Sequence, residues 1–286
     1  MGPSIAPLPS GSVFRTGPLR YCVNFGTRVR ATVRCVSSIT ETAICLRCWD
    51  YSETSQTVSL LTRDRGMLRG IAKGAKRPKA SFSGGFDPLT CGQLVAIIKP
   101  GRELALLTAW HLQEVFRALR QNLAANRAAL YMADLTHRLL TDQDPHPDVF
   151  DALLSSLQRC GLRGESSRAL LAFQWQILDS CGYRPELQHD VVTGEPLDED
   201  AEAIGFSALH GGTVEDTGQS DRWRVRPATI ELLRSLATGS SIEDSGSLDK
   251  ANRLLACYSR EVLGEEPPAM RWAFPDLAPH TQTIRP

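Results

Sequence analysis

The chain has 286 residues, of which 42% are hydrophobic and 22% are charged, an ordinary composition for a globular protein. At this length we expect about two domains. No apolar run approaches the roughly 20 residues that a membrane helix needs, so we expect no membrane-spanning segment. The eight cysteines lack the spacing of a disulfide framework, as in proteins of the reducing cytoplasm.

The formal net charge of zero conceals a division along the chain. Residues 1–115 carry 15 Lys and Arg against 7 Asp and Glu, whereas residues 116–286 carry 17 against 25. Within the basic part, residues 63–79 hold seven cations and one acid, Asp64. Such a run is either a solvated edge strand, where Lys and Arg also oppose aggregation, or a surface that binds the phosphates of a polyanion. Charge alone does not choose between the two.

The first 38 residues contain no acid and are rich in Pro, Gly, Ser and Arg. A segment of this composition is expected to be disordered, and it also has the Arg-rich, acid-free character of a transit peptide. Alternatively, translation starts further downstream, for example at Val36, and the leader is not made. We therefore leave residues 1–38 outside the predicted fold.

Residues 39–113 have the alternating hydrophobicity of β-strands. Five short strands are predicted, in the segments 41–53, 54–64, 66–75, 91–99 and 103–112. Asp64, Arg65 and Gly66 supply a hairpin turn, and the glycines at 66, 70 and 74 permit the sharp coiling of a small barrel. Five antiparallel strands in about 75 residues predict a closed barrel of the OB-fold type.

A period of two places Ile44, Leu46 and Cys48 on one face of the first strand. The same period separates Cys48 from Cys45, the other cysteine of a CxxC pair. Two thiols on opposite faces of a strand are poorly placed to share a metal ion. We therefore expect these cysteines to be structural residues of the strand.

After residue 113 the hydrophobic period changes from 2 to 3.6, which predicts a helical bundle over residues 114–264. One helix is capped by Asn122 and ends before Asp144, and others are expected over 147–160, 165–181, 227–237 and 248–263. The helix over 165–181 is apolar on most sides and is expected to be central. Residues 184–224 interrupt the helices as an inserted flap, and the proline-rich residues 265–286 are expected to form an extended tail. The predicted fold class is α+β.

The motifs of residues 50–90 resemble those of the bacterial recombination mediator family RecO. A strand pair D-Y-x-E-x-x-x-x-V-x-x-L-T is followed by G-x-L-R-G-x-A-K-G-x-x-R-P and by the loop F-x-G-x-x-x-P-L. Supporting matches are LTAWHLQEVFRALR at the junction of barrel and helices and CGYRPEL after the long central helix. The likeness covers residues 40–264.

The resemblance implies a protein that is not an enzyme, needs no cofactor and binds single- and double-stranded DNA through the barrel. It further implies annealing of complementary strands and contact with the acidic C-terminal tail of single-stranded DNA-binding protein. Together with RecR, such a protein helps to load RecA during DNA recombination and the repair of DNA damage. Its implied location is the cytoplasm, in association with the nucleoid.

Many relatives in this family carry a four-cysteine zinc finger in the flap. The corresponding positions of this chain hold no thiol: they are Asp190, Thr193, Glu215 and Gly218. His189 and His210 could be proposed as substitute ligands beside the acids, but zinc prefers Cys and His in closed tetrahedral sites. We therefore predict a zinc-finger-like insertion without metal, held by three apolar side chains: Phe206, Val191 and Leu197.

Six cations are the expected contacts to DNA phosphates: Arg47, Arg69, Lys73, Lys76, Arg77 and Lys79. Arg69 and Lys73 share one face of the third strand, and Arg47 alternates outward on the first. Flat side chains for base stacking are expected nearby, namely Trp49, Tyr51 and Phe82, with Phe86 as a further candidate. Each aromatic could instead belong to the barrel core.

Other functional classes remain open at this point. No Walker loop, HExxH or GxSxG motif supports an enzyme, and the Gly-rich residues 72–85 lack the helix that follows a P-loop. An OB-fold protein that binds RNA in translation or RNA processing is one alternative. Another is a protein-bridging factor, in which a groove between helices 165–181 and 248–263 accepts an acidic amphipathic tail through Arg168 or Arg253.

Overall fold

The computed structural model describes residues 37–198, 201–219, 222–239 and 246–277. The expectations for residues 1–36 and for residues 278–286 lie outside this part of the chain. Among the described residues, no helix has the length and hydropathy needed to cross a membrane.

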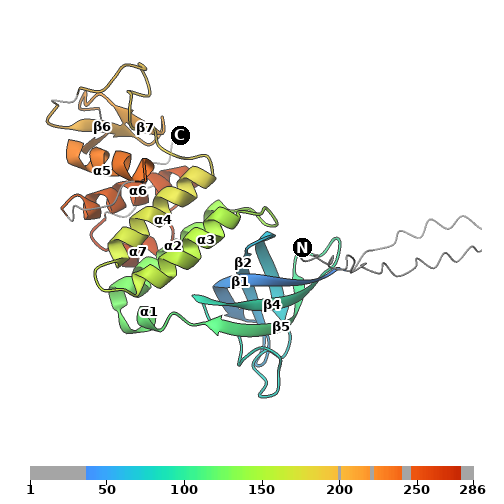
Figure 1. The fold of residues 1–286 in the computed structure, drawn as a ribbon. Helices are drawn as coiled ribbons and strands as arrows, with labels where there is room; N and C mark the ends of the chain where they lie inside the picture. Colours follow the sequence, from blue (N-terminus) through green and yellow to red (C-terminus); the bar gives the residue numbers. More distant parts are fainter. Residues whose placement is uncertain (1–36, 199–200, 220–221, 240–245, 278–286) are drawn as a thin grey trace, which may run out of the picture. The chain divides into compact units, whose positions relative to one another are not determined.

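The N-terminal strands form a closed barrel (Figure 1). Its strands are β1 (Ser37–Asp50), β2 (Gln56–Thr62), β3 (Gly66–Ala72), β4 (Thr90–Ile98) and β5 (Ala105–Glu114). They follow the order β1-β2-β3-β5-β4, in which β3 and β5 are parallel and the other pairs antiparallel. The predicted OB-like barrel and the α+β class are confirmed, although β1 begins at Ser37, inside the segment expected to be a leader.

The barrel interior is packed with small and apolar side chains. Gly70 faces inward, where a Cβ atom would lie 2.5 Å from the side chain of Leu107, so glycine here lets Leu107 fill the barrel interior. Phe82 and Phe86 enter the interior from the loop between β3 and β4, and the ring of Phe86 lies 4.9 Å from that of Trp110. Because Phe82 is only 4% exposed, it is not available for base stacking, contrary to that prediction.

A β-bulge in β1 changes the predicted faces of that strand. The pairing register with β2 shifts between Cys45 and Arg47, so Leu46 and Arg47 both lie on the outer side of the barrel. Cys48 consequently packs with Cys45 against the barrel interior. The prediction that these cysteines lie on opposite faces is wrong, because the extra residue breaks the period of two. Burial raises the pKa of both thiols, which favours their protonated form over metal binding.

Seven helices are present in the described residues: α1 (Arg117–Gln121), α2 (Leu123–Leu139), α3 (Pro147–Cys160), α4 (Ser166–Ser180), α5 (Pro227–Ala237), α6 (Leu248–Leu263) and α7 (Met270–Ala273). The side chain of Asn122 caps α2 by accepting from the N–H groups of Ala124 and Ala125 at 3.0 and 3.2 Å. Helix α4 contacts α2, α3 and α6, as its largely apolar sequence predicts. Helices α1 and α7 were not expected.

Helix α7 corrects the prediction of an extended tail. Ala269, Met270 and Phe274 are buried against α2, and the ring of Phe274 meets that of Tyr131 edge to face at 5.3 Å. The neighbouring prolines stop the chain from forming a long helix, but they permit one turn. Apolar contact with α2 then holds that turn in place.

One hydrophobic cluster joins the outside of the barrel to the helices. Ile44, Leu61 and Met67 on the outer barrel face belong to the same cluster as Tyr131 and Met132 of α2. The β2–β3 hairpin meets the loop after α2, where the N–H of Gln143 donates to the carbonyl of Met67 at 3.0 Å. Gly66 has a positive φ, and a Cβ atom there would lie 1.9 Å from the Asp144 carbonyl oxygen. The hairpin can approach this closely only with glycine at that position.

The carboxylate of Asp134 in α2 ties three segments together at this junction. Its side chain is 5% exposed and forms ion pairs with Arg47 of β1 and with Arg138 of its own helix, the latter at 3.2 Å. It also accepts the backbone N–H of Ala269, directly before α7, at 3.0 Å. A buried carboxylate with this set of donors holds the barrel, α2 and α7 in register.

We expect Asp134→Ala to lower the free energy of unfolding by about 3 kcal/mol, because it leaves the Arg47 guanidinium without its partner in a largely buried setting. Chemical denaturation measures the change. Asp142→Ala, which removes only the exposed pair with Arg69, is the control and should cost less than about 1 kcal/mol. Equal losses in the two variants would contradict the role given to Asp134.

The inserted flap contains a small sheet of order β7-β6-β8, formed by β6 (Ile204–Ser207), β7 (Gly212–Val214) and β8 (Trp223–Val225). Phe206 is fully buried, stacks on Trp223 and meets Tyr258 of α6 edge to face. Leu197 packs against the same cluster. This apolar contact attaches the flap to α5 and α6.

A second buried carboxylate, Asp190, connects the two loops of the flap. Its Oδ1 accepts the N–H groups of Val192 and Thr193 at 2.7 and 3.0 Å, and its Oδ2 accepts that of Glu215 at 2.6 Å. Burial alone would raise the pKa of Asp190, but these backbone donors lower it overall. The carboxylate thus bridges two of the loops in which the family resemblance implies paired cysteines, and it does so through hydrogen bonds.

We expect Asp190→Asn to loosen the flap, because an amide nitrogen would meet backbone N–H donors that the carboxylate now satisfies. The local opening free energy should fall by roughly 1 to 3 kcal/mol. Hydrogen exchange of the amides of residues 192, 193 and 215 measures it, and the exposed Glu195→Gln is the control. A chelator should leave exchange in the wild type unchanged; faster exchange with the chelator would instead indicate a metal.

Candidate nucleic-acid interface

Strand register arranges the outer face of the barrel in rows. Arg47 of β1 lies opposite Ser59 of β2, which lies opposite Arg69 of β3. In the next row, Trp49 is followed by Thr57 and Ile71, and the row continues through Leu106 to Ile97. Cations and apolar residues therefore occupy adjacent bands of one continuous surface.

A cleft of about 630 Å³ lies at the end of these rows. Ile71 and Lys73 of the β3 segment form one side, and the β4–β5 turn forms the other with Lys99, Arg102 and the acid Glu103. Tyr51, in the β1–β2 loop, borders it and is 67% exposed. The β2–β3 face with the β1–β2 and β4–β5 loops is the surface on which OB-folds bind oligonucleotides.

Lys99 and Arg102 are two residues of this cleft that the sequence did not identify. They flank the turn at Pro100 and Gly101, where Arg102 donates its backbone N–H to the Lys99 carbonyl at 3.2 Å. In the sequence, two cations beside a hairpin turn look like ordinary solvent-exposed turn residues, so nothing marks them as binding residues. Only closure of the barrel brings them opposite Lys73, which is 26 residues earlier than Lys99 in the chain.

The predicted phosphate contacts fall into three groups. Lys73, Arg77 and Lys79 are exposed and form no ion pair with any other described residue. Arg69 pairs with Asp142 at 3.3 Å and Lys76 with Asp50 at 2.5 Å, and both pairs are solvent-exposed. Exposed pairs contribute little free energy, so a phosphate can replace the carboxylate. Arg47 forms the third group, because its guanidinium is bound to the buried Asp134.

His137 of α2 lies at the junction of barrel and helices, within the electrostatic influence of Arg47 and Arg69. The pKa of this α2 side chain is lowered to about 4, chiefly by burial; the charges of Arg47, Arg69 and Arg138 also lower it, and that of Asp134 raises it. His137 is therefore neutral at physiological pH.

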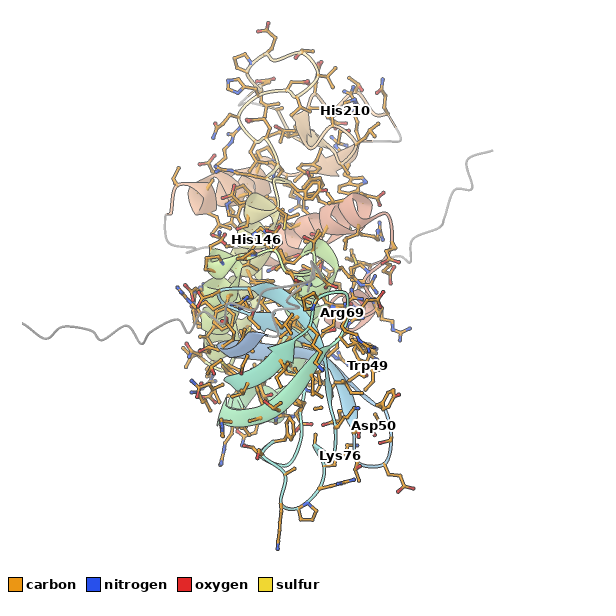
Figure 2. All side chains as sticks on the ribbon, turned by 90° about the vertical axis from the view of Figure 1, so that its right-hand side faces the viewer. Trp49, Asp50, Arg69, Lys76, His146 and His210 are labelled. Atoms are coloured by element: carbon orange, nitrogen blue, oxygen red, sulfur yellow. The ribbon has the colours of Figure 1, made fainter. Side chains whose placement is uncertain are left out.

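Two of the predicted aromatic residues are open to solvent. Trp49 is 49% exposed on the outer face of β1, next to Asp50, the partner of Lys76 (Figure 2). Tyr51 follows on the same strand end, beside the cleft. The two exposed rings therefore lie near the cations Lys73 and Lys76, an arrangement suited to bases and phosphates of a single strand.

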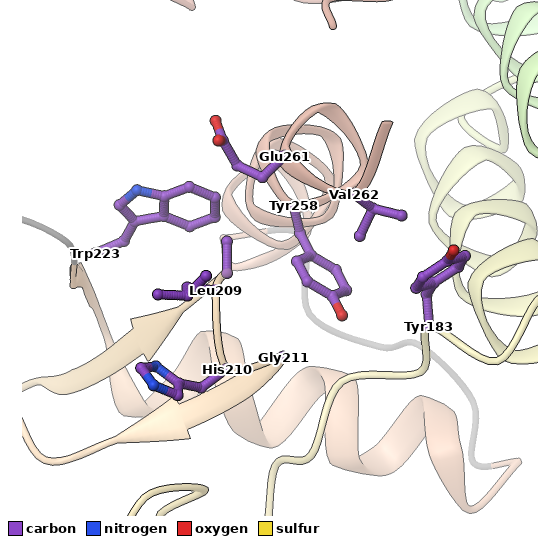
Figure 3. A pocket seen from close by; sticks show the side chains of 9 residues that line it. Tyr183, Leu209, His210, Gly211, Trp223, Tyr258, Glu261 and Val262 are labelled. Carbon is purple, nitrogen blue, oxygen red and sulfur yellow. The ribbon is translucent and has the colours of Figure 1, made fainter. Parts of the chain in front are cut away.

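The helical part contains two further hollows. One, of about 610 Å³, is lined by Tyr183, Trp223 and Tyr258, with Leu209 and His210 from the β6–β7 turn (Figure 3). The other, of about 360 Å³, lies between β8 and α6. Its polar rim is cationic and holds Arg224, Arg226, Lys250, Arg253 and Arg260, while Val225, Leu254 and Cys257 supply apolar surface.

Metal-ligating side chains do not converge anywhere in the described residues. No group of three or more His, Cys, Asp or Glu side chains is placed to hold an ion. His210, one of the substitute ligands considered for the flap, lies instead with its Nδ1 2.9 Å from the Ser207 hydroxyl.

Comparison with known proteins assigns both parts of the chain to one family. Residues 36–116 match the family model "Recombination protein O N terminal", and residues 120–271 match "Recombination protein O C terminal". The chain is 35% identical over 206 residues to the DNA repair protein RecO of Rhodopirellula baltica, covering 71% of this chain and 76% of that protein. It is 30% identical to RecO of Salinibacter ruber, covering 83% and 88%, and 32% identical to RecO of Idiomarina loihiensis, covering 81% and 96%.

The matched segments contain the barrel with its cleft and the helices with the flap, so the similarity extends over the whole candidate interface. The chain belongs to the RecO family of DNA repair proteins.

Proposed function

We propose that this protein is a non-enzymatic mediator of DNA repair and recombination. It binds single- and double-stranded DNA on the barrel, anneals complementary strands and, with RecR, helps to load RecA on DNA coated by single-stranded DNA-binding protein. The observation that carries this proposal is the cleft of the barrel. There Lys73, Lys99 and Arg102 surround the exposed Tyr51 at the oligonucleotide-binding side of an OB-fold.

The proposed phosphate contacts differ from those expected from the sequence. Five cations that form no ion pair with another described residue make up the main set: Lys73, Arg77, Lys79, Lys99 and Arg102. Arg69 and Lys76 join them by exchanging a surface carboxylate for a phosphate, whereas Arg47 remains bound to Asp134. Trp49 and Tyr51 stack on bases. Cations and flat rings can bind a polyanion without making or breaking covalent bonds. This supports a binding role for the surface over an enzymatic one.

The cationic groove between β8 and α6 supports a protein partner with an acidic tail. Arg253, named in the sequence as a candidate, lies in this groove beside an apolar floor. Its pairs with Asp249 and Asp276 involve exposed carboxylates that an incoming acid can replace. Arg168 of α4, the other candidate, pairs with Glu165 directly before that helix and does not line the groove. This favours Arg253 for the tail of single-stranded DNA-binding protein.

Binding to single-stranded DNA should weaken with salt. If the five cations of the main set, Arg69 and Lys76 all contact phosphates, the logarithm of the affinity should fall against the logarithm of salt concentration with a slope of about −4.9. The triple variant Lys73→Ala, Lys99→Ala, Arg102→Ala should reduce the slope to about −2.8. Fluorescence anisotropy at several salt concentrations gives both values.

The control variant removes two cations of the basic run 63–79 that lie on the β2–β3 hairpin, away from the cleft. Arg63 and Arg65 pair with Asp151 and Glu41, and the double alanine variant should keep the slope of the wild type. A slope near zero in the wild type would reject DNA binding by the barrel. Competition with RNA of the same sequence tests the alternative of an RNA-binding OB protein, which tighter RNA binding would favour.

Annealing of complementary strands should depend on the same surface. We expect the triple variant to slow annealing by at least tenfold, because both strands must first be bound and their charge neutralised. Annealing is followed with a fluorophore and quencher on complementary oligonucleotides. The Arg63 and Arg65 variant should anneal at the wild-type rate, and unchanged annealing by the triple variant would refute the assigned site.

A further inference from the structure

A groove of about 310 Å³ lies where the barrel meets the helices, and two open tryptophans line it. Trp49 comes from β1 and Trp272 from α7, and they are 49% and 45% exposed. Trp110 and Trp175 are buried and Trp223 is partly buried against Phe206. The two most exposed indoles of the chain therefore belong to the same groove, although they are 223 residues apart in sequence.

The floor of the groove is mostly apolar and is built by both parts of the protein. Leu46 and Cys48 contribute from β1, Leu130 from α2, and Pro268 and Ala269 from the segment before α7. Open indoles beside such a floor expose apolar surface that water disfavours. A flat apolar group of a ligand could cover this exposed surface and remove it from water.

Trp272 is held in position by the anchored turn of α7. Met270 and Phe274, on either side of it, are buried against α2, and the N–H of Ala269 is bound by Asp134. The indole is therefore presented by a fixed backbone. A rigid aromatic side chain loses little conformational entropy when a ligand binds it.

Charge next to the groove favours a nucleic acid over an apolar peptide. The guanidinium of Arg271 lies 5.0 Å from the centre of the Trp272 ring and is exposed. On the barrel side, Arg69 lies two strands from Trp49, in the adjacent row of the register described above. A stacking ring beside a cation that can reach the phosphate is the combination used by proteins that bind single strands.

We propose that Trp49 and Trp272 form a base-stacking site for single-stranded nucleic acid, which continues the barrel surface onto α7. Bases of the strand stack on the two indoles, and Arg271 and Arg69 contact the flanking phosphates. The inference rests on the proposed function and extends it, because it assigns part of single-strand binding to the helical part. A base in a duplex is already stacked, so this site selects unpaired strands.

The test uses the full chain with oligothymidine and a duplex of equal length. Trp272→Ala should bind oligothymidine about 5- to 150-fold more weakly, the loss that corresponds to one stacked base, and should bind the duplex as the wild type does. Trp272→Phe keeps apolar volume and should show a smaller loss. Its tryptophan fluorescence should be quenched less by oligothymidine, whereas Trp223→Phe should lose none of the quenching.

Thermal melting checks that the variants fold. We expect them to fold, because the Trp272 side chain is exposed and its replacement leaves no cavity in the core. Unchanged oligothymidine binding by Trp272→Ala, with loss in the Lys73, Lys99 and Arg102 variant, would overturn the stacking site and leave the proposed function intact. Unchanged binding in both would reject the barrel surface itself. If Trp272→Ala keeps DNA binding but loses an acidic tail peptide of single-stranded DNA-binding protein, the groove serves a protein partner and the inference is wrong.

Discussion

The ionic contact between Asp134 and Arg47 is the constraint on which the arrangement of this protein depends. A carboxylate almost fully removed from water needs its charge compensated, and here the barrel supplies the guanidinium and α7 supplies a backbone N–H. The same contact therefore attaches the barrel to α2 and fixes the turn that carries Trp272. It also occupies the guanidinium of Arg47, so this cation is not available to a phosphate, and one interaction contributes both to a structural junction and to the choice of phosphate contacts.

Ion pairing divides the cations of this chain by role. An arginine bound to a buried carboxylate is part of the fold, and removing either partner leaves a charge in a poor dielectric. Cations with exposed partners, such as Arg69 and Lys76, can exchange a carboxylate for a phosphate at little cost. Those around the cleft without partners among the described residues face solvent beside aromatic rings. The DNA-binding potential of the barrel thus comes from a subset of its positive charges.

A buried carboxylate also holds the loops of the flap together. In the flap, Asp190 gathers backbone N–H groups from two loops that lie 25 residues apart in sequence. Its buried position makes each of these hydrogen bonds costly to break. The flap is then joined to α5 and α6 by Phe206 and its aromatic neighbours, which keeps the cationic groove between β8 and α6 in a defined shape. The acidic C-terminal half therefore uses several of its acids within the fold.

The sequence by itself determined the OB-like barrel, the α+β class and the main helices, because hydrophobic period, turn glycines and the Asn122 cap are local signals. It also placed the basic run on β3. Tertiary structure alone decided which of these cations have an acid beside them, because Asp134, Asp142 and Asp50 are far in sequence from Arg47, Arg69 and Lys76. Tertiary structure likewise decided that Cys48 faces the barrel interior, because one extra residue in the β1 bulge shifts the alternation of faces. It also decided that Phe82 is buried. The sites at Lys99, Arg102 and Trp272 depend on barrel closure and on the packing of α7, which no local pattern encodes.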